Sequence, residues 1–385
     1  MNKGNLLVLG SICSTEDMDR RPYANVPGTL WLSGFCRGLQ HLGLNPIVVG
    51  HVPERIFPYG KVFLNPKKTL DYQFDQRPVK YINLPLVREP SLVIGYYQTT
   101  KKILKTGPAF VVITYNPMPY NVISARFAQK KFGAKWISIL LDPPSDTFSG
   151  DWEEYLCNYG IADVNVFLSW WAYSNFPYPN KYHFDVGCDK AIDAEWNFKQ
   201  SGPIKLLYSG KIEDSYGGSR ILAKTIQSIS DPRMEFIICG KGSCSMLNEV
   251  ARVDKRIKYM GFVSANQLDA LCKEADGFIN VRDPEHRDNL YIFPSKIAFY
   301  LKYAKPIFSI KTPGISPVYD DLVYFPQENN GNGLANIILS FFSSDFHEWG
   351  LRRQRIFKYI KNNGSWKSKC RELITYCESL GISFV

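Results

Sequence analysis

The chain has 385 residues, too many for one compact core and enough for two domains of ordinary size. Apolar residues make up 45% of it and charged residues 21%, which excludes a disordered or fibrous chain. The net charge is +10, so the surface favours anionic partners such as nucleotides, nucleic acid or acidic lipid headgroups, without choosing among them.

We expect neither a membrane span nor a secretion signal. No stretch reaches the roughly 18 apolar residues that a bilayer requires. The apolar run Leu6–Leu9 is shorter than the ~7–15 residues of a signal-peptide core. Nine scattered cysteines, with no Cys-x-x-Cys pair, fit free thiols in a reducing compartment, and five scattered histidines argue against a histidine-based metal site. The sequence therefore predicts a cytoplasmic protein without a metal.

Short apolar runs alternate with longer amphipathic segments along the first half. The predicted strands are Asn5–Leu9, Pro46–Val49, Val79–Leu84, Phe110–Thr114, Trp136–Leu141 and Val164–Leu168. The predicted helices include Leu30–Leu42, Ser91–Thr106 and Met118–Phe132. Within the first helix, one buried face is expected to hold Leu30, Trp31, Phe35, Leu39 and Leu42. Continuous apolar strands that alternate with helices predict parallel βαβ units and a sheet buried on both faces.

The same alternation restarts after a polar, turn-rich stretch near residues 190–203. Predicted strands are Ile204–Tyr208, Met234–Cys239, Ile257–Met260, Gly277–Ile279 and Pro306–Ile310. Predicted helices are Gly218–Ile229, Ser245–Val253, Gln267–Glu274 and Ser295–Tyr303, then His347–Lys361 and Ser365–Leu380 without a strand between them. The fold class is thus α/β, with two doubly wound domains at 1–190 and 200–362. Residues 363–385 are expected to form a closing helix that covers one domain or crosses back to the other.

The first candidate site follows the strand that begins the second half, because open parallel sheets bind ligands beyond the carboxyl ends of their strands. That strand leads into Gly210 and Lys211, and the next helix starts after Gly217 and Gly218. Glycines allow close approach of the backbone to a ligand, a helix N-terminus favours phosphate, and a lysine can neutralise a diphosphate. Taken alone, this pattern is more often an ordinary βα loop with a glycine turn, and no Gly-Lys-Ser/Thr makes it a P-loop.

The second candidate site is a polar loop from Arg282 that runs into a helix. Pro294 and Ser295 are typical of a helix start, and Lys296 follows them, so this point could hold a phosphate. A well-capped structural helix is the alternative. The carboxylates Asp283 and Glu285 lie in a charged loop between arginines and do not predict a metal site.

The third candidate site is in the first half. Gly28 comes just before the first predicted helix, and Asn116 and Asp142 come just after strand ends. A carboxylate such as Asp142 could orient an acceptor hydroxyl or act as a base, and it could equally be a turn residue before two prolines. No G-x-S-x-G elbow supports a hydrolase, and no G-x-G-x-x-G follows the first strand as in nicotinamide enzymes.

The second half resembles the nucleotide-sugar-binding half of GT-B-fold glycosyltransferases, specifically the retaining family 4. The segments that carry the resemblance are YSGKIEDSYGG from Tyr208, FIICGKGS from Phe236, KYMGFVSANQLDALCKEADGFI from Lys258 and FPSKIAFYLKYAKPIFS from Phe293. The resemblance places the donor near Gly210, Lys211, Tyr216, Gly217, Gly218, Gly240, Phe262, Val263, Phe293, Pro294, Ser295 and Lys296. Ser365–Trp366 resembles the start of the family's closing helix, which crosses back to the first domain.

The chain departs from the family pattern at several donor positions. Lys211 stands in place of the family arginine, and Tyr216 in place of the family lysine. The two glutamates that the family often places eight residues apart correspond to Tyr291 and Phe299. The second glutamate usually binds the donor ribose. Either another residue does so here, for which Asp288 is the candidate, or the donor site is altered, or the protein is inactive.

The resemblance implies transfer of a hexose from a nucleoside-diphosphate sugar, with UDP-sugars favoured, to a hydroxyl of a glycan or lipid-linked oligosaccharide. It implies retention of anomeric configuration, with Lys211 and Asp142 in catalytic roles, Gly28 and Asn116 on the acceptor side, and no obligatory metal or other cofactor. Bacterial relatives build surface polysaccharides such as O-antigen or capsule, so peripheral contact with the inner face of the membrane is expected.

Three alternatives stay open. Tyr216 and Phe299 are also consistent with a catalytically silent subunit that binds sugar nucleotides. A GT-B-fold sugar-nucleotide epimerase would share the fold. A basic nucleic-acid-binding protein fits the charge, but no known module supports it, so we expect no nucleic-acid partner. The donor sugar and base, the acceptor, the linkage and the oligomeric state are not encoded in a readable pattern.

Overall fold

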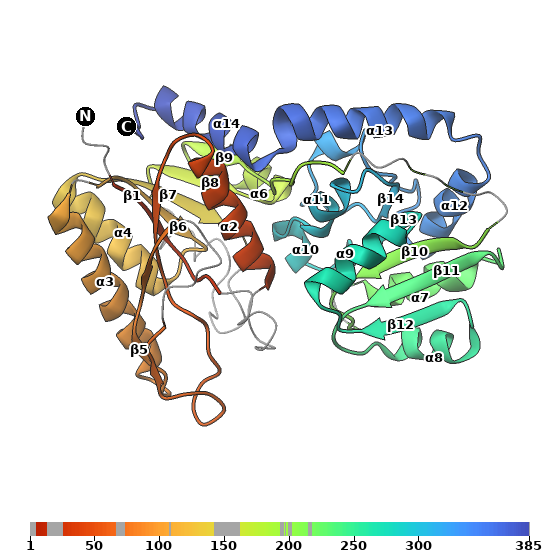
Figure 1. Ribbon diagram of the computed structural model, residues 1–385, viewed down its shortest axis with the longest axis horizontal. Coiled ribbons are helices and arrows are strands. Elements are labelled where there is room, and N and C mark those ends of the chain that lie inside the picture. Colours follow the sequence, from red (N-terminus) through yellow and green to blue (C-terminus); the bar gives the residue numbers. More distant parts are fainter. Residues whose placement is uncertain are drawn as a thin grey trace. The chain divides into compact units, whose positions relative to one another are not determined.

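The computed structural model describes residues 5–13, 26–66, 74–107, 109–141, 162–192, 196, 198, 202–214 and 218–384 (Figure 1). The chain divides into two compact units. The first unit consists of Met1–Leu168, Tyr173–Gly187 and Trp366–Val385, and the second of Ser169–Ala172 and Cys188–Ser365.

The first unit is built on a parallel sheet. Among the described residues, seven strands form it in the order β4-β2-β1-β6-β7-β8-β9. Their bounds are β1 (Asn5–Leu9), β2 (Pro46–Gly50), β4 (Asp75–Pro78), β6 (Ala109–Tyr115), β7 (Lys135–Leu140), β8 (Val164–Phe167) and β9 (Lys181–His183). Central strands of aliphatic residues, buried on both faces, explain why β1, β6 and β7 are readable from sequence.

Three long helices flank this sheet: α2 (Val26–Gln40), α3 (Arg88–Thr106) and α4 (Pro119–Phe132). Helices α3 and α4 lie side by side (Figure 1). Proline at the first position of α4 fits a helix start, and Gly133 ends the helix in the left-handed conformation at φ 67°. Trp136 of β7 is wholly buried, and its indole N–H donates to Thr114 Oγ1 at 2.9 Å.

Two predictions for this unit are wrong. The run Val79–Leu84 is not one strand: β4 precedes it, and β5 (Tyr81–Ile82) instead pairs antiparallel with β3 (Phe63–Leu64). Strand β4 escaped prediction because an edge strand of polar residues lacks an apolar run. Leu30 of α2 is exposed, since it lies about 100° around the helix from its buried neighbour Trp31.

The second unit is also built on a parallel sheet. Among the described residues, five strands form it in the order β12-β11-β10-β13-β14. Their bounds are β10 (Ile204–Ser209), β11 (Met234–Cys239), β12 (Ile257–Gly261), β13 (Gly277–Asn280) and β14 (Ile307–Ser309). The helical elements are α6 (Trp170–Asn175), which begins in this unit, then α7 (Ser219–Ser228), α8 (Ser245–Val253), α9 (Ala265–Glu274), α10 (Asp288–Tyr291), α11 (Lys296–Leu301), a 3₁₀ turn (Pro317–Tyr319), α12 (Gly331–Phe342), α13 (His347–Tyr359) and a π-helical turn (Ile360–Gly364).

Local hydrogen bonds fix where these helices begin. Ser264 and Gln267 form a capping box at the start of α9, with Ser264 N–H donating to Gln267 Oε1 at 2.9 Å. Helix α12 was not predicted, because its first turn, Gly-Asn-Gly, has low helix propensity. The Asn330 side chain compensates by accepting a hydrogen bond from Gly333 N–H at 2.9 Å.

Helix α14 (Trp366–Ser379) returns to the first unit, where it lies beside α2 (Figure 1). The indole of Trp366 occupies the space that side chains at Gly34 and Gly187 would need. It meets Trp31 edge to face, with 5.5 Å between ring centroids, and Lys369 pairs with buried Asp185. The prediction of two doubly wound α/β domains, with a C-terminal helix that crosses back to the first, is confirmed.

Candidate functional site

The topology of the second unit selects one position for a ligand. Strand order reverses between β10 and β13, and open α/β sheets bind ligands outside the carboxyl ends of the strands at such a reversal. The loops concerned begin at Gly210 after β10 and at Val281 after β13. This is the position at which the sequence predicts the first two candidate sites.

Glycines bring the loops at this position into contact. A side chain on Gly240, after β11, would overlap the carbonyl of Gly210. Gly218 has φ 78°, and a Cβ placed on it would lie 2.7 Å from the backbone nitrogen of Arg282. The predicted donor residues Gly210, Gly218 and Gly240 are thus brought together, and two of them are held where only glycine fits without strain.

Two cations lie at this meeting point. Lys296 begins α11, is partly buried, and its ammonium lies where a side chain on Gly210 would go and 4.7 Å from the ring centroid of Tyr208. Burial, together with the charge of Arg282, lowers the pKa of Lys296 to about 7. An anion bound here would offset the repulsion between these two side chains, so their arrangement favours a phosphate group.

Aromatic hydroxyls support the loop after β10. Tyr208, whose pKa burial raises to about 12, donates to the carbonyl of Lys211 at 3.1 Å. The hydroxyl of Tyr300 accepts from Ser209 N–H at 3.0 Å, and its ring stacks on Phe278 with 4.3 Å between centroids. These contacts hold the carboxyl end of β10 in a fixed position beside Lys296.

Arg282 is the functional candidate that the sequence analysis did not assign to the donor site. Its Nη1 donates to Oδ1 of the buried Asn289 at 3.2 Å, and Asn289 in turn donates to the carbonyl of Asp283 at 2.7 Å. The usable signal was its position two residues after β13, at the reversal of strand order. In the sequence it stands at the start of a polar loop, directly before Asp283, which hides that position.

Lys211 lies on the loop after β10 but is already paired. Its ammonium is 2.5 Å from a carboxylate oxygen of Glu213, and Glu213 N–H donates to Ser219 Oγ at 3.1 Å. The catalytic role of Lys211 stays a prediction. The predicted donor residues Tyr216 and Gly217 lie outside the described residues.

A second cation–aromatic pair follows β11 and β12. The ammonium of Lys241 lies 3.9 Å from the ring centroid of Phe262, which is exposed, and Tyr259 donates to the carbonyl of Gly242 at 3.3 Å. An exposed aromatic face beside a cation can stack with a nucleobase. Phe262 therefore offers a surface suited to a base, and contact of Phe262 and Val263 with the base stays a prediction.

The remaining predicted donor residues have structural contacts. Tyr291 packs edge-on against Trp171 with 5.2 Å between centroids, and Phe293 lies 5.2 Å from the ring of Tyr319. Helix α11 has six residues and begins at Lys296, after Pro294; Ser295 precedes it without capping any N–H through its side chain, so the expected cap is wrong. Asp288 begins α10, and its N–H meets His286 Nδ1 at 3.3 Å. Their roles toward a donor stay predictions.

The acceptor-side predictions fall in the first unit. Gly28 lies inside α2 rather than before it, and its carbonyl accepts from Tyr115 Oη at 2.9 Å. Asn116 has φ 55°, and its Oδ1 accepts from Leu141 N–H at 3.4 Å. Both contacts tie strand ends to their neighbours, and contact with an acceptor stays a prediction. Asp142 lies outside the described residues.

Two general features were also searched for. Within the described part of the chain, no three His, Cys, Asp or Glu side chains are grouped as a metal site would need. Among the same residues, no helix combines the length and apolar character needed to cross a bilayer.

Comparison with family models and with curated proteins finds no sequence match. Solved structures do match. A lipopolysaccharide outer core galactosyltransferase in its apo form is 12% identical, with 98% of this chain and 99% of that chain covered and a TM-score of 0.62. A pneumococcal O-GlcNAc transferase in complex with UDP and GlcNAc is 9% identical, with 99% and 100% covered and a TM-score of 0.62. A putative UDP-N-acetylglucosamine 2-epimerase from Listeria monocytogenes is 9% identical, with 98% and 97% covered and a TM-score of 0.57.

The chain has the GT-B fold. At 9–12% identity these matches establish the architecture, whereas the reaction must be argued from the site. Arg282 and Lys296 both belong to the second unit of this fold, where they follow β13 at the reversal of strand order.

Proposed function

We propose that the chain is a retaining glycosyltransferase that moves a hexose from a nucleoside-diphosphate sugar, with UDP-sugars favoured, to a hydroxyl of a glycan acceptor. One arrangement carries the proposal: at the strand reversal of the second unit of a GT-B fold, burial and the positive charge of Arg282 lower the pKa of Lys296 to about 7. The similar structures include two transferases, one of them in complex with UDP.

The chemistry follows from charge. As the bond from sugar to diphosphate breaks, positive charge grows on the sugar ring and negative charge on the leaving diphosphate. Cations fixed in advance at the diphosphate lower the energy of that transition state. In the proposal Lys296 and Arg282 supply this positive charge, and Lys211 adds to it when its ion pair with Glu213 breaks. No metal is then obligatory.

The base side of the donor is assigned to the exposed ring of Phe262 beside Lys241. Recognition of the ribose is assigned to Asp288, because hydrophobic side chains stand at the two glutamate positions of the family. On the acceptor side, Gly28, Asn116 and Asp142 stay candidates, with Asp142 as the base. An acceptor of surface-polysaccharide type, free or lipid-linked, belongs to the same proposal.

A peripheral membrane contact is also proposed, on a small ribbon of the first unit. Strands β3 and β5 and their flanking turns are joined by Phe57 N–H donating to the carbonyl of Asn83 at 3.2 Å, and by Asn83 Nδ2 donating to that of Lys61 at 2.9 Å. Its side chains include Tyr59, Phe63 and Leu86, which are 78%, 74% and 96% exposed. Apolar side chains this exposed on one ribbon indicate an interaction surface.

The occupant we assign to this ribbon is an anionic lipid surface. Exposed Arg55, Lys61 and Lys80 stand on the same ribbon segments as the exposed rings. Apolar tips flanked by basic side chains bind bilayers by burying the former and pairing the latter with acidic headgroups. In sedimentation with vesicles, the protein should bind phosphatidylglycerol-containing bilayers and not neutral ones. Phe63→Asp and Leu86→Asp should release it, and equal binding to both bilayers would refute the assignment.

The transferase proposal is tested by incubating the protein with each sugar nucleotide, with and without a candidate glycan, and analysing all products. Transfer to the glycan, with the anomeric configuration kept, supports the proposal. A new sugar nucleotide of altered stereochemistry would identify an epimerase, the alternative that the Listeria monocytogenes match favours. Binding without turnover of any donor would favour the silent subunit, which Tyr216 and Phe299 motivate.

A further inference from the structure

A cation and an aromatic ring stand together where β11 and β12 end. The ammonium of Lys241 lies 3.9 Å from the ring centroid of Phe262. Both side chains are exposed, the ring to 54%, so a ligand can reach each of them. Lys241 directly follows Gly240, whose backbone touches that of Gly210 in the loop after β10. The pair therefore lies beside the loops that are proposed to hold the donor.

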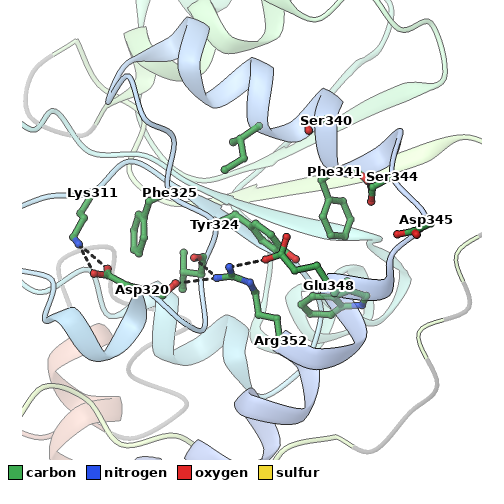
Figure 2. A pocket seen from close by; sticks show the side chains of 13 residues that line it. Lys311, Asp320, Tyr324, Phe325, Ser340, Phe341, Ser344, Asp345, Glu348 and Arg352 are labelled. Carbon is green, nitrogen blue, oxygen red and sulfur yellow. Dashed lines mark hydrogen bonds and ion pairs between the residues drawn. The ribbon is translucent and has the colours of Figure 1, made fainter.

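The ammonium of Lys241 has no acidic partner. Other basic side chains of the second unit are bound by carboxylates, as in the pocket between α12 and α13, where Asp320 binds Lys311 at 2.6 Å and Glu348 binds Arg352 at 3.0 Å (Figure 2). Within the described part of the chain, the ammonium of Lys241 contacts only the aromatic ring beside it. A cation held only by an exposed ring is held weakly, so it is available to a ligand.

The loop that carries Lys241 is anchored at three successive backbone positions. The three hydrogen bonds run from Gly240 N–H to the Gly261 carbonyl at 2.8 Å, from Ile212 N–H to the Lys241 carbonyl at 2.8 Å, and from Tyr259 Oη to the Gly242 carbonyl at 3.3 Å. Because Gly261 directly precedes Phe262, these bonds hold the backbones of Lys241 and Phe262 at a fixed separation. Only the lysine side chain is left to adjust to a ligand.

A nucleobase that stacks on this face of Phe262 competes with the ammonium for the ring. The ammonium lies over the ring, in the space that a stacked base needs. Stacking therefore displaces the ammonium to the edge of the base, where it needs an acceptor in place of the ring. A carbonyl oxygen on the base edge supplies one, and a charge-assisted hydrogen bond is stronger than the exposed cation–ring contact that it replaces.

We infer that Lys241 selects donors whose base carries a carbonyl oxygen, as uracil, cytosine and guanine do and adenine does not. The inference rests on the proposed donor site and adds the residue that recognises the base. Discrimination has an attractive and a repulsive part. A carbonyl oxygen accepts from the ammonium, whereas the amino group of adenine presents hydrogens to an ammonium that has no acceptor.

The test compares two nucleotides and one substitution. Dissociation constants of UDP and ADP are measured by isothermal titration calorimetry for the full chain and for Lys241→Met, which removes the ammonium and keeps an unbranched apolar side chain. Lys241→Met should weaken UDP about tenfold, the low end for one hydrogen bond to a charged group because the site is exposed. It should leave the dissociation constant of ADP unchanged.

Controls separate base recognition from a general effect of charge. Lys258→Met, whose ammonium Glu235 binds at 2.7 Å, should change neither dissociation constant. An equal loss of UDP and ADP affinity in Lys241→Met would place the ammonium on the ribose or the phosphates and overturn the inference, as would unchanged affinity for both. UDP binding that depends on Lys296 and not on Lys241 would overturn this inference alone. Failure of wild type to bind any nucleotide would overturn the donor site itself.

Discussion

The lowered pKa of Lys296 predicts that nucleotide binding takes up a proton. In the free protein, burial of the Lys296 ammonium and the charge of Arg282 lower the pKa of Lys296 from its ordinary value of 10.5 to about 7. A bound diphosphate would return its pKa toward the ordinary value. Above pH 7 the free protein must therefore bind a proton before or as it binds UDP, and UDP affinity must fall.

The size of this pH effect on UDP affinity follows from the two pKa values of Lys296. With a pKa of about 7 in the free protein and 10.5 in the complex, UDP affinity falls about fiftyfold between pH 7 and pH 9. At pH 8 each UDP takes up about 0.9 of a proton. Isothermal titration in two buffers of different ionisation enthalpy measures that uptake directly. The diphosphate itself is fully ionised at this pH, so it does not contribute.

Variants assign the proton to Lys296. Lys296→Met should bind UDP weakly and with no dependence on pH above 7. Arg282→Met should move the pH dependence upward, because it removes the charge that helps to lower the Lys296 pKa. Lys258→Met, in an exposed ion pair with Glu235 at 2.7 Å, should behave as wild type. Equal heats in the two buffers at pH 8, or equal affinity at pH 7 and pH 9, would refute the reasoning.

Three further predictions concern the scaffold. Gly218→Ala places a side chain at φ 78°, 2.7 Å from the backbone nitrogen of Arg282, so its free energy of unfolding in urea should fall by about 1–3 kcal/mol and UDP binding should weaken. Gly133→Ala, at φ 67° with open space around it, should lower the free energy of unfolding by about 1–2 kcal/mol and leave UDP binding unchanged. Trp366→Ala removes the indole that fills the space beside Gly34 and Gly187, so the free energy of unfolding should fall by about 3 kcal/mol and α14 should become sensitive to protease. Unchanged cleavage would contradict this packing. His51 is buried beside Tyr96 Oη, 2.9 Å from its Nδ1, and burial lowers the pKa of His51 to about 3. As the pH falls, the imidazole is therefore protonated in the unfolded chain before it is in the folded one, and the free energy of unfolding should fall by about 2 kcal/mol between pH 7 and pH 5. His51→Gln should lose that part of the pH dependence.

Much of the fold could be predicted because its central strands are uniform. Strands β1, β10, β11 and β13 are apolar runs between turn residues, and their positions agree with the sequence to within a residue or so. Strand β4 and helix α12 could not be found that way. The first is a polar edge strand, and the second begins with glycines that only the Asn330 cap makes compatible with a helix.

The sequence identifies the loops that form the candidate donor site, but not the contacts between their side chains. The glycine and lysine after β10, and the lysine that begins α11, are visible in the sequence. The contact of Gly218 with Arg282 was not, because it joins loops that are 64 residues apart (282 − 218) and depends on strand order. Pairing of Lys211 with the nearby Glu213 was equally hidden, since acidic residues in a charged loop take partners that only the backbone path decides.

The most direct test of the donor site is thermal unfolding against UDP, GDP, ADP and CDP, each with magnesium and with EDTA, for wild type, Arg282→Met and Lys296→Met. A nucleotide at ~100 times its dissociation constant adds about 2.7 kcal/mol, a shift of several degrees. The account predicts such a shift for wild type with one base, unchanged by EDTA, and little or none for either variant. No shift with any nucleotide, or an equal shift in all three proteins, would contradict it.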